Sequence, residues 1–395
     1  MRSFQGLDVL VVMTLVQMVM AAGSLILPAI APITAAALGV DAALVGMQVS
    51  LVYGCAMVGA FFCGRLVARH GSCRMSQVAL GLMAAGCCLA SIPHVAAIAL
   101  GSVFMGLGYG LPVPAASRLL LRFTDPAKRN LVFSLKQSGV PLGGFLAGIA
   151  APTLSSSFGW HSPLFICSLA CVLLIVFLQR YRLLWDADRV ILATDAGTRA
   201  AAFSDILRSP LLKGLILVFF LLSAIQLCVV TFAVTGLVHD LGYDPVAAGL
   251  VLAGIQIASM TARIGWGWLA DRIGSGVTVL LLLIFLLVVA LLSTTALDPE
   301  APVALVVTVF AVLGVTAVGW NGVLIAECAR LSPPGKVADV ASLTMVASYC
   351  GVLCGPFTFA FLQLRLGGVL ATFSMLAIPA LLALAGLAAV ARRRP

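Results

Sequence analysis

Residues 254–274 read GIQIASMTARIGWGWLADRIG, and this stretch shows how the whole chain is organised. It is an apolar run that carries one arginine, Arg263, and ends in a charged turn from Gly267 to Gly274. Arg263 precedes Asp271 by eight residues, which is about 12 Å along a helix. A charge at that depth in a membrane helix is costly and marks a functional position by default.

The composition is that of an integral membrane protein. Of the 395 residues, 62% are hydrophobic and 9% are charged, whereas a soluble domain carries about 25% charged residues. The net charge of +9 does not indicate nucleic-acid binding, because the bases lie in short turns between apolar runs. The 11 cysteines lie within apolar runs without metal-ligand spacing, so we interpret them as packing residues and expect no metal or cofactor.

Twelve stretches are apolar and long enough to cross a membrane, which takes roughly 17–25 residues. They cover about residues 8–32, 42–64, 75–93, 95–121, 130–153, 163–180, 211–238, 245–269, 277–297, 302–329, 338–362 and 367–391. The first run is too long for the core of a signal peptide, so we expect a retained helix. A long polar break at residues 181–210 separates residues 1–180 from residues 211–395, which predicts two domains of six helices each.

Basic residues predict the orientation of the helices. One side of the membrane holds nearly all the bases. They lie in the central loop, and in turns and the tail at Arg65, Arg69, Arg74, Arg118, Arg122, Lys128, Arg129, Arg272, Arg330, Lys336 and Arg392 to Arg394. The turns on the other side hold Arg365. Because positive loops stay in the cytoplasm, we expect both termini and the 181–210 loop on the cytoplasmic face of the inner membrane. Lys136 and Arg263 are the two bases that this topology does not explain.

The second helix overlies the eighth when the sequence is shifted by 203 positions, the separation of Gly39 from Gly242. The matching residues are Gly39, Asp41, Gly46, Met57, Gly64, Leu66, Arg69 and Gly71 with Gly242, Asp244, Gly249, Met260, Gly267, Leu269, Arg272 and Gly274. A repeat of half the chain length is typical of transporters built from two similar halves. Arg263 overlies Ala60 and Asp271 overlies Ala68, so the repeated helix itself requires neither charge.

The turn GRLVARHG at residues 64–71, and more closely GWLADRIG at residues 267–274, resembles the signature loop of the major facilitator superfamily. The resemblance covers the whole chain. It implies an all-α membrane protein of 12 transmembrane helices, in two pseudo-symmetric six-helix bundles that open a central site alternately to each side. We assign to this structural and gating motif Gly64, Arg65, Arg69, Gly71, Gly267, Asp271, Arg272, Gly274, Glu327 and Arg330. Ala68 replaces the usual acid in the first copy, which implies a latch that is weaker or built differently.

Arg263 shares a helix face with Gln256 and Ser259, at spacings of seven and four residues. A guanidinium flanked by an amide and a hydroxyl suits a planar carboxylate bound through two hydrogen bonds. The alternative is that Arg263 extends towards the cytoplasm and pairs with Asp271 or a carbonyl. The spacing from Arg263 to Asp271 also resembles helix eight of monocarboxylate, oxalate and nitrate porters, where the arginine contacts the anion. Nitrate porters have a second arginine at the position of Ala60, so nitrate is disfavoured.

Lys136 lies at a similar depth in helix five, ~10 Å from the cytoplasmic boundary. The resemblance implies that helices five and eight face one another across the two halves, which would bring Lys136 and Arg263 near the same cavity. The alternative is a lysine that extends to the cytoplasmic surface. Residues 139–144, GVPLGG, partly resemble the helix-five motif of drug antiporters and also favour close helix packing.

The residues expected to bind substrate are Arg263, Lys136, Gln256, Ser259, Gln137, Gln17, Gln226 and Asn321. The resemblance places Gln17, Gln226 and Asn321 on cavity-lining helices, although hydrogen bonds between helices are the alternative for each amide.

These features predict a secondary transporter that moves a small organic anion, a carboxylate, by proton symport or anion exchange. The alternative is a proton-coupled exporter of drugs or metabolites, although such pumps commonly need an acid inside the membrane and none lies near the centre of a span. An enzyme is not expected, because the four histidines are far apart. We expect the bilayer, an anionic substrate and protons as partners, no nucleic acid, and a monomer.

Overall fold

The computed structural model describes residues 2–39, 42–187, 206 and 208–392. Helices dominate this part of the chain, and it contains no strand. Most of the predicted 181–210 loop lies outside the described residues, as do Arg393 and Arg394. The helices divide between two compact units, which are described one at a time.

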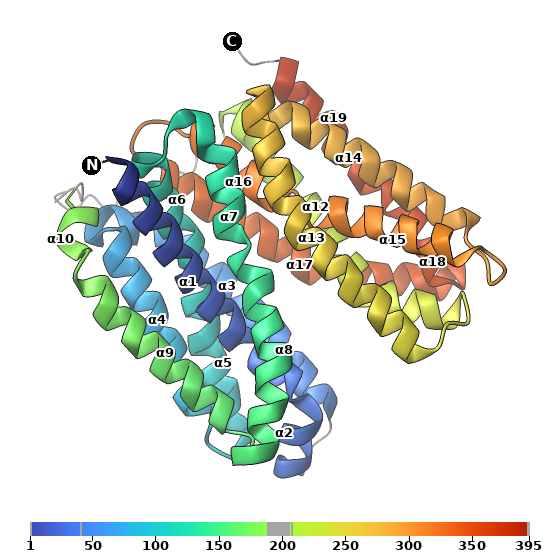
Figure 1. Ribbon diagram of the computed structural model, residues 1–395, viewed down its shortest axis with the longest axis horizontal. Coiled ribbons are helices and arrows are strands. Elements are labelled where there is room, and N and C mark those ends of the chain that lie inside the picture. The colour runs from blue at the N-terminus through green and yellow to red at the C-terminus, as the bar shows by residue number, and fades with distance from the viewer. Residues whose placement is uncertain (1, 40–41, 188–205, 207, 393–395) are drawn as a thin grey trace. The chain divides into compact units, whose positions relative to one another are not determined.

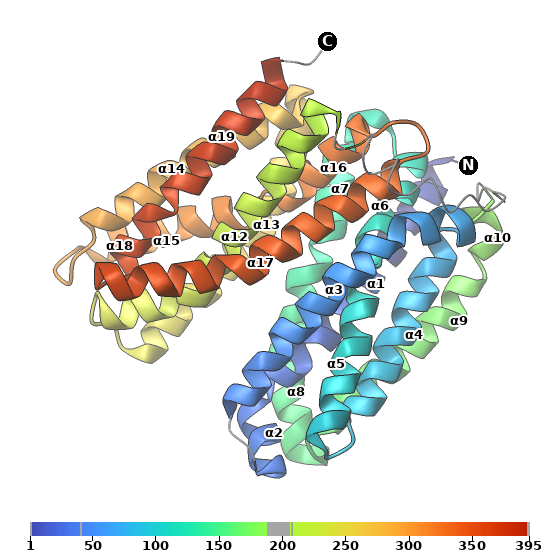
Figure 2. The ribbon, with the colours of Figure 1, turned by 180° about the vertical axis from the view of Figure 1, so that it is seen from behind.

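Unit 1 consists of residues 1–125, 136–201 and 332–346. Its helices are α1 (Arg2–Ala29), α2 (Ala31–Leu38), α3 (Ala42–His70), α4 (Ser72–Ala90), α5 (Val95–Tyr109), α6 (Pro112–Phe123), α8 (Gly139–Phe158), α9 (Ser162–Gln179) and α10 (Arg182–Trp185). Helix α1 lies along α8, and α4 lies between α5 and α9 (Figure 1). Helix α3 packs against α5, as the reverse view shows (Figure 2).

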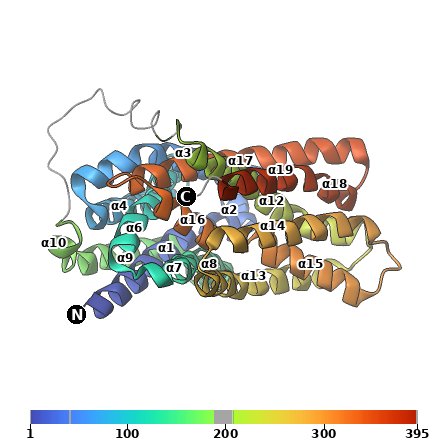
Figure 3. The same ribbon diagram turned by 90° about the horizontal axis from the view of Figure 1, so that it is seen from above.

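Unit 2 consists of residues 126–135, 202–331 and 347–395. It contains η1 (Pro126–Lys128), α12 (Pro210–His239), α13 (Pro245–Ile273), α14 (Gly276–Ser293), η2 (Thr294–Ala296), α15 (Val303–Ala317), α16 (Asn321–Leu331), α18 (Val369–Met375) and α19 (Ala377–Arg392). Helix α15 contacts α13 and α14, and α19 contacts α12 and α14 (Figure 3). Two further helices, α7 (Arg129–Gln137) and α17 (Val337–Leu366), each contribute residues to both units.

Ten helices among the described residues are long and apolar enough to cross a membrane. The two predicted spans missing from those ten are the segment of α7 and α8, which carries Lys136, and α13, which carries Arg263. Several side chains of α13 lie outside what the structure describes, which leaves this helix out of the count.

Several predicted spans are interrupted by a break. The span at 95–121 divides into α5 and α6 where Pro112 begins a new helix without a backbone donor. The span at 302–329 divides into α15 and α16 at residues 318–320, and the span at 130–153 divides at Ser138. In a membrane, the carbonyl groups freed at such breaks need partners from neighbouring helices or side chains.

The internal repeat is visible in the backbone. Gly39 and Gly242 have φ angles of 65° and 70°, and Gly71 and Gly274 have φ angles of 92° and 74°. All four lie in the left-handed region, where a side chain would be strained. The second and the eighth helix are therefore each bracketed by glycines with positive φ, at positions that the sequence repeat pairs.

Candidate functional site

Arg263 is buried in unit 2, with 3% of its surface exposed. Its Nε atom donates a hydrogen bond of 3.0 Å to the carbonyl oxygen of Val318. Val318 lies in the break between α15 and α16, where its carbonyl is available to a side chain. A main-chain carbonyl is one of the two partners that the alternative for this arginine predicts, and the bond holds the guanidinium inside the unit.

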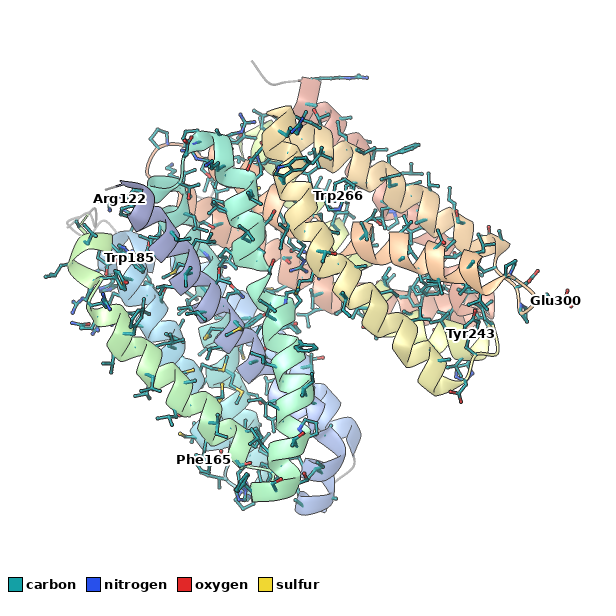
Figure 4. The ribbon with its side chains drawn as sticks, viewed as in Figure 1. Arg122, Phe165, Trp185, Tyr243, Trp266 and Glu300 are labelled. Atoms are coloured by element: carbon teal, nitrogen blue, oxygen red, sulfur yellow. The ribbon has the colours of Figure 1, made fainter. Side chains whose placement is uncertain are left out.

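A row of polar side chains on α13 binds carbonyl groups next to this break. Ser259 Oγ lies within hydrogen-bond distance of Gly314 O, at 2.9 Å, and of Ile255 O of its own helix, at 2.6 Å, and its single O–H can be donated to either. Trp266, labelled in Figure 4, donates from its indole Nε1 to Val315 O at 3.1 Å. These bonds satisfy the broken helix and fix its position against α13. Ser259 thus serves interhelical contact, and the side chain of Gln256 lies outside what the structure describes.

Asn321 and Gln226 form a pair in the same unit. Asn321 Nδ2 donates to Gln226 Oε1 at 2.9 Å and to Val318 O at 3.4 Å. The carbonyl of Val318 therefore accepts hydrogen bonds from both Arg263 and Asn321. Through the Val318 carbonyl, in the break between α15 and α16, Arg263 shares a hydrogen-bond acceptor with Asn321, which in turn donates to Gln226.

Lys136 is buried in unit 1, with 2% of its surface exposed. Its Nζ atom donates to Gln17 Oε1 at 2.6 Å and to Gln137 Oε1 at 3.1 Å. Gln17 comes from α1, which packs closely on α8 because Gly139 and Gly143 leave room for the backbone carbonyls of α1. The lysine therefore points into the unit and not to its surface, and it brings three predicted site residues together.

Buried acids are few in the part of the chain that the structure describes. Among the described residues, the buried carboxylates are Asp186 and Glu327. Glu327 Oε2 accepts from Arg330 at 2.9 Å, and its Oε1 accepts from the backbone N–H of Gly276 at 3.1 Å. This ion pair is the charge cluster predicted at the end of helix ten.

The second signature turn contacts the beginning of helix five. The carboxylate of Asp271 accepts from the backbone N–H of Asn130 at 3.1 Å, from that of Leu131 at 2.8 Å, and from Asn130 Nδ2 at 2.9 Å. Gly267 lies so close to this segment that a Cβ there would overlap Ser134. Asp271 therefore caps the first turn of α7, within unit 2.

The first signature turn has no acid of its own, because Ala68 takes that place. Gly64 instead packs against Asp339, an acid in the first turn of α17, within unit 1. Arg65 and Arg69 are exposed. The acid next to the first turn is therefore Asp339 of α17, whereas the second turn contains its own acid, Asp271 of α13.

Asp186 is a structural residue that sequence reasoning did not single out. Its carboxylate accepts from the backbone N–H groups of Cys73 at 2.7 Å and Arg74 at 3.0 Å, and so caps α4. It follows Trp185 (Figure 4), whose ring stacks on Tyr181 with centroids 4.5 Å apart. In the sequence Asp186 is one of many loop charges, and nothing local distinguishes it.

The described residues contain no group of three or more histidines, cysteines or acids arranged to hold a metal ion. The groups described above are buried bases, amides and main-chain carbonyls. Such groups can bind an anion and hydrogen-bond its substituents.

A family model described as Major Facilitator Superfamily matches residues 12–356 and 230–395. The 4-hydroxybenzoate transporter PcaK of Acinetobacter baylyi is 23% identical over 279 residues, which cover 62% of this chain and 60% of that protein. Monocarboxylate transporter 13 of Bos taurus is 26% identical over 257 residues, which cover 64% of this chain and 58% of that protein. The chain thus matches about three fifths of the length of these relatives.

Solved structures share the fold along nearly the whole chain. The E. coli fucose:proton symporter FucP aligns with a TM-score of 0.81 at 14% identity, covering 96% of this chain and 98% of that one. The human organic anion transporter MFSD10 aligns with a TM-score of 0.75 at 17% identity, covering 97% and 99% of the two chains. At these identities the alignments establish the fold, and they confirm the predicted architecture.

Proposed function

Because the chain belongs to the major facilitator superfamily, a family of membrane transporters and not of enzymes, we propose that it carries a small organic anion across the cytoplasmic membrane. The charged group of the substrate is a carboxylate, and transport proceeds by alternating access. Both termini lie in the cytoplasm, the transporter acts as a monomer, and proton symport or anion exchange drives it.

The observation that carries this proposal is the environment of Lys136. Its ammonium group is buried and contacts two amide oxygens, from Gln17 and Gln137, with no carboxylate beside it in the described part of the chain. Burying an ammonium without a counter-charge costs several kcal/mol. A site that bears this cost is suited to a ligand that brings the negative charge itself.

Arg263 is a second buried base, and it lies in unit 2. Its Nε bond to the Val318 carbonyl fixes the plane of the guanidinium. The planar guanidinium is suited to bind the carboxylate through two parallel hydrogen bonds. An arginine suits this role better than a lysine because its planar fork matches the two carboxylate oxygens.

The names of the two relatives agree with this substrate class. One is a transporter of 4-hydroxybenzoate and the other is a monocarboxylate transporter, and both ligands carry one carboxylate. Among the described residues Lys136 contacts amide oxygens and no carboxylate, and a buried base does not favour the cationic drug of the exporter alternative.

The test is uptake by the purified protein in proteoliposomes, across a panel of small carboxylates, with and without a pH gradient. Arg263→Ala is expected to lower carboxylate uptake at least tenfold, and Arg263→Lys to restore only part of it, because a lysine cannot bind the carboxylate through a fork. Uptake that follows the pH gradient indicates symport, and uptake that requires carboxylate inside the vesicle indicates exchange.

A matched control separates the site from general loss of charge. Arg365→Ala removes an exposed arginine at the end of α17 and is expected to leave uptake unchanged. If Arg263→Ala transports the panel as well as the unmodified protein, the proposed role of Arg263 is wrong. If the protein moves no carboxylate but expels cationic dyes, the exporter alternative replaces this proposal.

A further inference from the structure

The Gln226–Asn321 pair has a fixed polarity. In an isolated pair of amides either side chain could be the donor, because the amide oxygen and nitrogen are nearly interchangeable in shape. Here the Val318 carbonyl determines the orientation of the Asn321 amide. Its carbonyl can only accept, so Asn321 must turn its Nδ2 towards it, at 3.4 Å.

The orientation of Gln226 follows from that of Asn321. The second N–H of Asn321 Nδ2 points to Gln226 at 2.9 Å, so the Gln226 oxygen must face it and the Gln226 nitrogen must face away. Both side chains are half-buried, on α12 and α16 of unit 2. Within the described residues, neither Asn321 Oδ1 nor Gln226 Nε2 makes a hydrogen bond.

The pair therefore offers one acceptor, Asn321 Oδ1, beside one donor, Gln226 Nε2. A carboxylate can use the donor but not the acceptor, because both of its oxygens are acceptors. A hydroxyl group can use both at once, since it has one O–H donor and two lone pairs. A hydrocarbon substituent can use neither, and would leave two polar atoms without partners, which is unfavourable.

The pair is also close to the proposed carboxylate site. Arg263 Nε and Asn321 Nδ2 donate to the same oxygen atom, at 3.0 Å and 3.4 Å, so the two nitrogens are separated by no more than the sum of these distances. A small molecule bound by the arginine through its carboxylate can therefore reach the amides with a second substituent.

We infer that Gln226 and Asn321 select substrates that carry a hydroxyl group, so that the transported anion is a hydroxycarboxylate. This inference rests on the proposed function, because it takes Arg263 as the group that binds the carboxylate. The amides are specificity residues: they act on the choice between acids, whereas the arginine acts on all of them.

The test compares acids that differ by one hydroxyl group: lactate with propionate, 3-hydroxybutyrate with butyrate, and 4-hydroxybenzoate with benzoate. Half-saturating concentrations are measured in proteoliposomes, directly or by competition. In at least one pair the hydroxylated acid is expected to bind about tenfold or more tightly than its partner. Equal affinities in all three pairs would overturn the inference, as would a preference for the amide acid succinamate over every hydroxy acid.

Two variants locate the selectivity. Gln226→Met and Asn321→Leu keep the size of the side chain and remove its hydrogen-bonding atoms, and each is expected to bring the affinity ratio of the preferred pair to about one. Ser223→Ala is the control, because Ser223 lies on the same helix and bonds to Ser348 at 2.7 Å; its ratio is expected to match the unmodified protein. A ratio that survives both amide substitutions contradicts the assignment.

The outcomes separate this inference from the proposed function. If no carboxylate is transported, the proposed function is wrong and the inference fails with it. If carboxylates are transported in an Arg263-dependent way without regard to the hydroxyl group, only the inference is wrong. The comparison of matched acids needs no variant, so poor folding of an amide variant does not prevent a decision.

Discussion

Replacing Asp271 with alanine is expected to destabilise the protein through the first turn of α7. Three hydrogen bonds to the carboxylate disappear, two of them from backbone N–H groups of Asn130 and Leu131. Those N–H groups have no partner within their own helix, because they belong to its first turn. The turn would also lose the negative charge that the positive end of the helix favours.

The size of the effect follows from the geometry. Loss of a helix cap costs about 1–2 kcal/mol, and the unfavourable change at the helix dipole adds about 0.3–1 kcal/mol. Asp271 is half-buried, so water replaces part of what is lost. We therefore expect a loss of about 2 kcal/mol, which corresponds to a fall in Tm of about 2–4 °C for a chain of this size. Asp271→Asn is expected to lower the free energy of unfolding by about half as much. One side-chain oxygen is kept as an acceptor, while the other is replaced by an NH2 group that faces N–H donors.

A thiol-reactive fluorescent dye can measure this in detergent, because most of the 11 cysteines are buried and react only as the protein unfolds. Heating rates must match, since membrane proteins commonly unfold irreversibly. Asp298→Ala is the control: that acid lies in an exposed turn and accepts one bond, from the N–H of Glu300 at 3.0 Å. If Asp271→Ala unfolds at the same temperature as Asp298→Ala, the cap contributes nothing and the reasoning is refuted.

Three further changes test other parts of the structure. Asp186→Ala should lower the Tm by a similar amount, because it leaves the N–H groups of Cys73 and Arg74 uncapped; an unchanged Tm in the dye assay would contradict the cap. Gly322→Ala should cost about 1–3 kcal/mol in the same assay, because the new Cβ overlaps the backbone of Ser134; a variant as stable as the unmodified protein would show that the helices can separate there. Lys136→Met should lower anion uptake at least tenfold while the Tm stays the same or rises, because a buried charge is replaced by an apolar side chain of similar length; full uptake with a lowered Tm would instead make the lysine structural.

The architecture was accessible from the sequence because membrane burial leaves a strong pattern. Apolar runs, basic turns and the repeat of Gly39 and Gly71 in Gly242 and Gly274 predict the helices and the fold. Lys136 and Arg263 stand out for the same reason, since bases inside apolar runs are rare. The prediction that both are drawn into the protein interior depends only on local sequence, and each is buried in its own unit.

The partners of these residues were not accessible in the same way. Gln17 and Lys136 are hydrogen-bonded although they lie 119 positions apart in the sequence, and no sequence pattern predicts such a pair. The Val318 carbonyl is a main-chain atom, so no residue type marks it. Ser259 shares a face with Arg263 as predicted, yet its hydroxyl is used by the neighbouring helix. The acid opposite Gly64 comes from residue 339, which a search of the first half of the chain would not find.

The anchor of Arg263 has a consequence for how such a carrier can change. Any amino acid at position 318 has a carbonyl, so no single substitution there deletes the acceptor that orients the guanidinium. The amides of Gln226 and Asn321, by contrast, are side chains and can be exchanged one at a time. Related carriers can therefore change which acid they select by substituting Gln226 or Asn321. The orientation of Arg263 is kept in all of them, because it depends on a backbone carbonyl and not on a side chain.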